Sequence, residues 1–231
     1  LLANGGYPFT RYADLSKTAV IMPNTAHNSV VSTYLDLLGQ FGAQTGYPAL
    51  RVTVVNPGNA NSVKDKNLIV MGTRSDQPLV HSWGKKLPLL YTDSGVHIQN
   101  LQGPFSRLTN SLPWWYQSPG NKVYGPRALG QFLAQGKAPA GVMEEVISPL
   151  QANRVALFMM VENDRDWHIM TNTLLDSALR SRIFGNLSLF SAGDNSPHSF
   201  ILPAPYIDVG HLPFWTWLFW RLNHAPWMIA G

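Results

Sequence analysis

The chain has 231 residues, a net charge of +4, 45% hydrophobic residues and only 13% charged residues. Soluble domains usually carry about a quarter charged residues, so we expect another protein or lipid to cover part of this surface. The sequence has no run rich in Lys and Arg, so it gives no indication of a nucleic-acid partner. The lack of cysteine excludes a thiolate nucleophile, a cysteine zinc site and disulfides.

The first segment, residues 1–16, is rich in glycine and aromatic residues and shows no hydrophobic period. It also lacks the pattern of a signal peptide. We interpret it as a linker or packing segment from an upstream domain, in a chain cut from a longer protein at both ends.

An apolar run at 18–22 predicts a buried strand, and a helix is expected over about 26–45. Asn24 or Thr25 can cap the start of this helix, and Gly46 can end it. Its predicted inner face comprises Val30, Val31, Tyr34, Leu35, Leu38 and Phe41.

Further elements follow at short intervals. Strands are predicted at 50–55, 68–72, 87–91, 96–99, 141–147, 155–161, 186–191 and 198–202, and helices at about 76–85 and 127–135. The run at 155–161 is apolar on both faces, which is typical of the centre of a parallel sheet. Asn163 or Asp164 should cap one more helix, with Trp167, Met170, Leu174 and Ala178 on its inner face.

This alternation of strands and helices predicts an α/β domain over residues 17–202. We expect a flavodoxin-like fold with a mainly parallel sheet. Residues 103–126 should form a long loop that contains Trp114, Trp115 and Tyr116. These aromatic residues are either a platform for sugar stacking or part of a loop tucked under the domain or a partner.

The tail, residues 203–231, holds four of the eight tryptophans of the chain. A helix over about 212–223 would be apolar nearly all round, with Arg221 as its only formal charge. Tryptophan favours the membrane–water interface, so this segment is predicted to be an interfacial helix. The alternative is a terminal helix docked on the core of the domain. The predicted membrane and partner contacts are Phe214, Trp215, Trp217, Leu218, Trp220 and Arg221.

No local motif points to an enzyme. The chain has no phosphate-binding loop, no dinucleotide fingerprint, no nucleophile elbow and no metal-binding histidine spacing, so we predict no catalytic, cofactor or metal residues. Glu144 and Glu145 are adjacent on a predicted strand and should point to opposite faces. The loop from Gly72 to Asp76 follows a strand and includes Arg74, so it is either an anion site or an ordinary strand-to-helix turn.

Three stretches resemble the regulatory B subunit of bacterial cellulose synthase. These are residues 6–16, residues 45–50 and residues 211–215. The resemblance covers nearly the whole chain, but only the C-terminal part of that family.

The resemblance implies a non-catalytic periplasmic scaffold subunit, with carbohydrate-binding domains upstream and a single transmembrane anchor downstream. It implies the catalytic subunit and membrane lipid as partners, with the nascent glucan as an alternative partner. The family is often labelled cyclic di-GMP-binding. This sequence has no R-x-x-x-R pair, so we expect the dinucleotide to act on the complex rather than on this chain.

Overall fold

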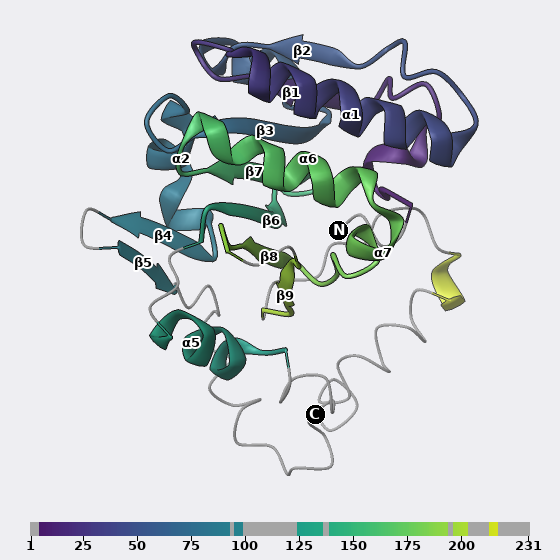
Figure 1. Ribbon diagram of the computed structural model, residues 1–231. Coiled ribbons are helices and arrows are strands. Elements are labelled where there is room, and N and C mark those ends of the chain that lie inside the picture. Colours follow the sequence, from purple (N-terminus) through teal and green to yellow (C-terminus); the bar gives the residue numbers. More distant parts are fainter. Residues whose placement is uncertain are drawn as a thin grey trace.

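The chain folds into a mixed α/β structure (Figure 1), described by a computed structural model over residues 5–92, 95–98, 124–135, 139–193, 196–202 and 213–216. The strands are β1 (Thr18–Ile21), β2 (Thr53–Val55), β3 (Asn67–Thr73), β4 (Leu89–Thr92), β5 (Gly95–Ile98), β6 (Gly141–Ile147), β7 (Val155–Val161), β8 (Leu187–Phe190) and β9 (His198–Phe200). The α-helices are α1 (Asn28–Thr45), α2 (Pro78–Trp83), α5 (Pro126–Ala134), α6 (Trp167–Leu175) and α7 (Ser177–Arg180). Short 3-10 helices are η2 (Phe9–Arg11), η3 (Pro57–Val63), η4 (Gly84–Lys86) and η6 (Asp164–Asp166).

Seven strands form one sheet in the order β2-β1-β3-β7-β6-β8-β9. The pairings β2–β1, β1–β3 and β3–β7 are parallel, whereas β7–β6, β6–β8 and β8–β9 are antiparallel. The α/β class is confirmed, but a flavodoxin-like, mainly parallel sheet is not. One reason is the connection 148–154 between β6 and β7, which is shorter than the dozen or so residues that a parallel crossover needs.

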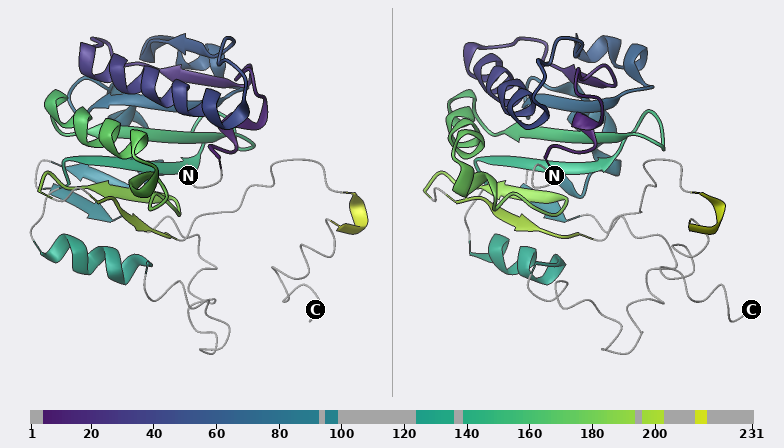
Figure 2. Two further views of the ribbon diagram at one scale, coloured as in Figure 1. Left: turned by 45° about the vertical axis from the view of Figure 1, so that its right-hand side comes forward. Right: turned by 90° about the vertical axis from the view of Figure 1, so that its right-hand side faces the viewer.

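β7 lies at the boundary between the two halves of the sheet, and all of its residues are buried. One face of the sheet packs against α1 and α6, and Met159 and Trp167 belong to that core. The other face packs against α2 and η3, and it includes Phe158. Figures 1 and 2 show α1 and α6 side by side across the first face. The run at 155–161 therefore has apolar residues on both sides because helices cover both faces.

The buried face of α1 differs from the predicted one. Gly46 ends the helix in a left-handed conformation, as expected, but the residues that face inward are Val30, Thr33, Leu37 and Phe41. Thr33 is tolerated inside because its Oγ1 lies 3.0 Å from the carbonyl oxygen of Ser29 and 2.8 Å from Oγ1 of Thr171 in α6. Tyr34 and Leu38 are partly buried and pack against the same core, as expected. Val31 and Leu35, also expected inside, are 36% and 58% exposed.

The segment that precedes β1 packs onto the domain. Phe9 and Leu15 are buried in the core beneath α1. The Thr18 hydroxyl donates to the carbonyl oxygen of Phe9 at 2.8 Å, and the Asn67 amide donates to that of Pro8 at 3.3 Å. These bonds fix residues 8–18 against the edge of the sheet where β1 and β3 begin.

The helix after β7 begins as predicted but ends earlier. Asn163 and Asp166 form a capping box at the start of η6, which continues into α6. Asp176 then adopts an extended conformation and its side chain caps the separate helix α7. The prediction that Ala178 continues the inner face is therefore wrong, since it is exposed on α7.

The antiparallel half has its own core, in which α5 packs against β8 and β9. Phe132 of α5 contacts Phe200 edge-on, with ring centroids 5.9 Å apart. β4 and β5 form a separate antiparallel hairpin beside this half (Figure 1). Leu89, the first residue of the hairpin, is buried in the same core.

Candidate interaction surfaces

The loop from Gly72 to Asp76 lies where ligands usually bind an open α/β sheet. Its polar groups, however, bond to one another. Oδ1 of Asp76 accepts from the backbone N–H of Thr73 at 2.6 Å, and the hydroxyls of Thr73 and Ser75 are 2.9 Å apart. A side chain on residue 72 would lie 2.8 Å from Cβ of Gln77, so glycine permits this tight packing. These contacts favour an ordinary strand-to-helix turn.

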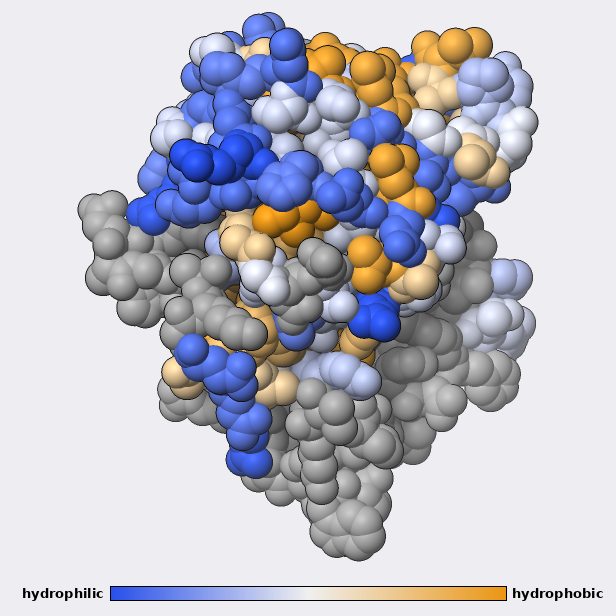
Figure 3. Space-filling model, in the orientation of Figure 1, coloured by the Kyte–Doolittle hydropathy of each residue, from blue (hydrophilic) through white to orange (hydrophobic). Residues whose placement is uncertain are grey.

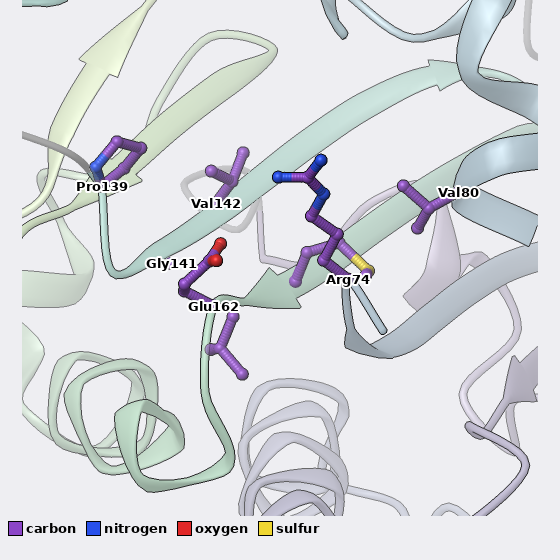
Figure 4. A pocket seen from close by; sticks show the side chains of 8 residues that line it. Arg74, Val80, Pro139, Gly141, Val142 and Glu162 are labelled. Atoms are coloured by element: carbon purple, nitrogen blue, oxygen red, sulfur yellow. The ribbon is translucent and has the colours of Figure 1, made fainter. Parts of the chain in front are cut away.

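The space next to this loop is too small for an organic ligand. Arg74, Gly141, Val142 and Glu162 line a pocket (Figure 4) with about 10 Å³ of free volume. That volume accommodates roughly one water molecule. This pocket is therefore too small to hold a cofactor.

The loop after β7 is also occupied by contacts within the chain. Oδ1 of Asp164 accepts a hydrogen bond of 3.4 Å from the Ser29 hydroxyl, and its Oδ2 lies 3.3 Å from Nε2 of His27. Within the described parts of the chain, no three metal-ligating side chains come together. The prediction of no metal residues concerns the whole chain and remains a prediction.

A buried acid lies on the face of β6 that turns away from α1 and α6. Glu144 has no exposed surface, and its Oε2 accepts a hydrogen bond of 3.3 Å from the backbone N–H of Leu89. Its Oε1 has no hydrogen-bond partner among the described residues. Burial raises the pKa of Glu144 to about 8, and the bond from Leu89 only partly opposes this. At neutral pH the carboxyl is therefore mostly protonated.

The burial of Glu144 was not predicted from the sequence, in which Glu144 and Glu145 were considered only as a potential catalytic pair. The alternation of the strand did carry a signal. Glu144 lies two residues from both Val142 and Val146, so it shares their face, and those valines are 2% and 8% exposed. An acid flanked by apolar residues at this spacing points into the core.

The predicted tail contacts are only partly described. Residues 214–216 are helical, and the rings of Phe214 and Trp215 meet edge-on with centroids 5.5 Å apart. Phe214 is 63% exposed and Trp215 is 68% exposed. The other predicted tail contacts, Trp217, Leu218, Trp220 and Arg221, lie outside the described residues. The predicted glucan contacts Trp114, Trp115 and Tyr116 also lie outside them.

The described helices that cover one face of the sheet carry almost no charge. α1 has 18 residues with Asp36 as its only formal charge, and α6 has nine residues with none. Figure 3 shows this side, where apolar and polar residues are interspersed. None of the described helices is long and apolar enough to cross a bilayer. The low charge content of the whole chain is therefore also a property of this pair of helices.

Comparison with known proteins gives the same family that the sequence resembles. The family model described as cellulose synthase BcsB, second FD domain, matches residues 1–159. A protein of Komagataeibacter xylinus named cyclic di-GMP-binding protein is 30% identical over 230 residues, which is 99% of this chain and 27% of that protein. A Xanthomonas axonopodis pv. citri protein with the same name is 29% identical over 99% of this chain and 28% of its own length.

A second protein of Komagataeibacter xylinus, named cellulose synthase 1, is 29% identical over 97% of this chain and 14% of its own length. The chain thus spans less than a third of the length of these relatives. Because the family model covers well over half of the chain, the assignment rests on the domain itself and not on a short motif. The chain belongs to the BcsB family of cellulose synthase subunits, and its residues 1–159 match the second FD domain of that family.

Proposed function

We propose that this chain is part of a non-catalytic scaffold and regulatory subunit that supports the catalytic subunit of a bacterial cellulose synthase. The observation that carries the proposal is the exposed pair Phe214 and Trp215 on a chain of this family. Each ring keeps more than 60% of its surface exposed. Such exposure of two adjacent large apolar residues is typical of a surface that lipid or protein covers.

The proposed arrangement has three parts. Residues 1–16 connect to an upstream carbohydrate-binding domain, residues 17–202 form the α/β domain, and residues 203–231 form an interfacial helix that leads to a transmembrane anchor. The helix lies on the periplasmic face of the inner membrane. Its contacts with lipid and with the catalytic subunit are Phe214, Trp215, Trp217, Leu218, Trp220 and Arg221. In this arrangement the subunit supports translocation of the glucan without catalysing its synthesis.

The catalytic role is assigned to the partner subunit for two reasons. The polar groups of the loop around Arg74 form hydrogen bonds with one another. The pocket beside this loop has a free volume of only about 10 Å³. Two of the relatives are named cyclic di-GMP-binding protein. For this chain we propose that the dinucleotide acts on the complex, because the sequence has no R-x-x-x-R pair.

A second candidate function is guidance of the emerging glucan. The sequence feature that favours it is the aromatic cluster of Trp114, Trp115 and Tyr116, since aromatic rings stack on the apolar faces of sugars. Replacement of these three residues by alanine should then reduce binding of cello-oligosaccharides. Unchanged binding would remove this cluster from the proposal.

The scaffold proposal is tested in the complete complex. The full-length subunit carrying Phe214→Glu and Trp215→Glu is reconstituted with its catalytic subunit in lipid. We expect less catalytic subunit to co-purify and glucan synthesis per complex to fall. The same double substitution made at the exposed apolar residues Val31 and Leu35 is the control for added charge. Normal association and synthesis in the tail variant would refute the proposed role of the tail.

A further inference from the structure

A groove separate from the edge of the sheet lies where α6, α7 and the turn after β8 meet. Its free volume is about 410 Å³, and its lining includes His168, Asn172, Leu179 and Ser191. This volume falls in the range of sites that bind small organic molecules. It is far larger than the pocket beside Arg74, so a small organic ligand fits here and not there.

The charge of the groove excludes most ionic ligands. No Lys or Arg lines it, so an anion would find no counter-charge. Its one carboxylate is Asp176, whose Oδ1 accepts from the backbone N–H groups of Ala178 at 2.8 Å and Leu179 at 3.1 Å. Because that carboxylate already caps α7, the groove favours an uncharged ligand.

The polar groups of the groove suit a ligand that both donates and accepts hydrogen bonds. Nδ1 of His168 contacts the carbonyl oxygen of Arg165, which can only accept. Nδ1 therefore carries the proton, and Nε2 is an acceptor in the neutral ring. The Asn172 amide supplies a donor and an acceptor from an exposed position on α6. Such paired donors and acceptors match hydroxyl groups.

Ser191 provides an independent indication of a ligand. It lines the groove, is only 5% exposed, and its hydroxyl has no hydrogen-bond partner among the described residues. A buried hydroxyl without a partner costs about 1–3 kcal/mol of stability, so its presence needs a reason. Rotation of its side chain toward the groove would let it bond to a bound hydroxyl group.

We infer that this groove binds a short stretch of neutral β-linked glucan. The sugar hydroxyls bond to Asn172, Ser191 and Nε2 of His168, while the aliphatic side chains of Leu175 and Leu179 cover an apolar face of the ring. The choice of glucan among neutral polyols rests on the proposed function. The groove would then hold the polymer against the charge-poor face of the domain.

Titration of cellohexaose into the 231-residue chain tests this inference. We expect weak, saturable binding that does not change between 0.05 and 0.5 M NaCl, because the ligand is uncharged. Asn172→Trp, which fills the groove, should weaken binding at least tenfold. The control is Gln44→Trp on the exposed part of α1, which should leave binding unchanged. No saturable binding, or equal binding by Asn172→Trp, would overturn the site.

Ser191→Ala separates a ligand contact from a structural role. Removing an unpartnered buried hydroxyl should leave the melting temperature equal or higher, whereas cellohexaose binding should fall about fivefold. Unchanged affinity would exclude Ser191 from the site. Association with the catalytic subunit is measured separately. A negative result for cellohexaose binding would therefore refute the glucan site, whereas a negative result for association would refute the scaffold role.

Discussion

The side chain of Glu144 in β6 and the backbone N–H of Leu89 in β4 join the hairpin to the main sheet through a hydrogen bond of 3.3 Å. The bond reaches the side-chain oxygen Oε2 of a residue with no exposed surface. Glu144 lies opposite Phe158 in β7 and Leu187 in β8, which are both apolar. Ionisation would therefore place a charge among apolar neighbours.

Glu144→Gln should stabilise the protein at high pH and have little effect at low pH. Glu144 has a pKa of about 8 in the folded chain, whereas the ordinary pKa of a glutamate is 4.5. Between these values the folded state binds more protons than the unfolded state, so the contribution of Glu144 to stability falls as the pH rises. The amide mimics the protonated acid and does not titrate. Urea unfolding at pH 5 and pH 8.5 measures the difference, which should reach at least about 1–2 kcal/mol at pH 8.5.

Asp65→Asn is a control of opposite sign. A hydrogen bond from Lys17 at 3.2 Å lowers the pKa of Asp65, so its contribution is present above the unfolded pKa and lost as the pH falls. This variant should be slightly less stable than the native chain at pH 8.5.

The outcome that would contradict the prediction for Glu144 is a gain in stability of Glu144→Gln that does not depend on pH. Such a result would show that the acid is ionised in the folded state or accessible to water.

Asn67→Leu should destabilise the protein by about 2–4 kcal/mol, because it leaves two backbone groups without partners. The side chain of Asn67 accepts from the N–H of Val155 at 3.2 Å and donates to the carbonyl oxygen of Pro8 at 3.3 Å. Asn61→Leu on exposed η3 is the matched control and should change stability by less than about 0.5 kcal/mol. Equal denaturation midpoints for the two variants would contradict this role of Asn67.

Trp215→Glu should reduce binding to lipid vesicles without changing the melting temperature. The ring is 68% exposed, so a charge there breaks little packing within the domain. Leu50→Glu, at a position 75% exposed, is the control for adding a charge elsewhere. Co-flotation with vesicles of phosphatidylethanolamine and phosphatidylglycerol measures binding, and scanning calorimetry measures stability. A large fall in melting temperature for Trp215→Glu would favour the alternative of a helix docked on the core.

Cyclic di-GMP should show no saturable micromolar binding to the 231-residue chain. A guanine dinucleotide is held by arginine side chains that stack and form bidentate bonds. The groove beside Ser191 has no Lys or Arg in its lining, and the pocket beside Arg74 is too small. Calorimetric titration provides the measurement, and a stoichiometric heat signal with a micromolar dissociation constant would refute the prediction.

The sequence allowed much of the parallel half of the sheet to be predicted, since its elements carry local signals. The apolar run at 155–161, the cap at Asn163 and the left-handed Gly46 depend on residues close in the chain. The antiparallel direction of β6, β8 and β9 depends on pairing between distant strands, which periodicity does not report. The inner face of α1 was predicted only in part for a similar reason. Thr33 is buried because of a partner in α6, 138 residues away.

The candidate surfaces were less predictable than the fold. Composition indicated a poorly charged surface, and in the structure α1 and α6 carry a single formal charge between them. The groove near Ser191 combines α6, α7 and the turn after β8, so no contiguous motif reveals it. The unpartnered hydroxyl of Ser191 is visible only when the surrounding atoms are placed.

The pairing of β3 with β7 also determines the order in which the chain can fold. The bond from Val155 to Asn67 joins residues 88 positions apart, and the hairpin β4–β5 and α5 lie between them in sequence. During synthesis, β3 therefore emerges with one apolar edge unpaired long before its neighbour exists. Such an edge promotes aggregation, and contacts of this range slow folding. A nascent chain that stops before residue 155 should depend on a chaperone, whereas one that has passed residue 161 can complete the central sheet.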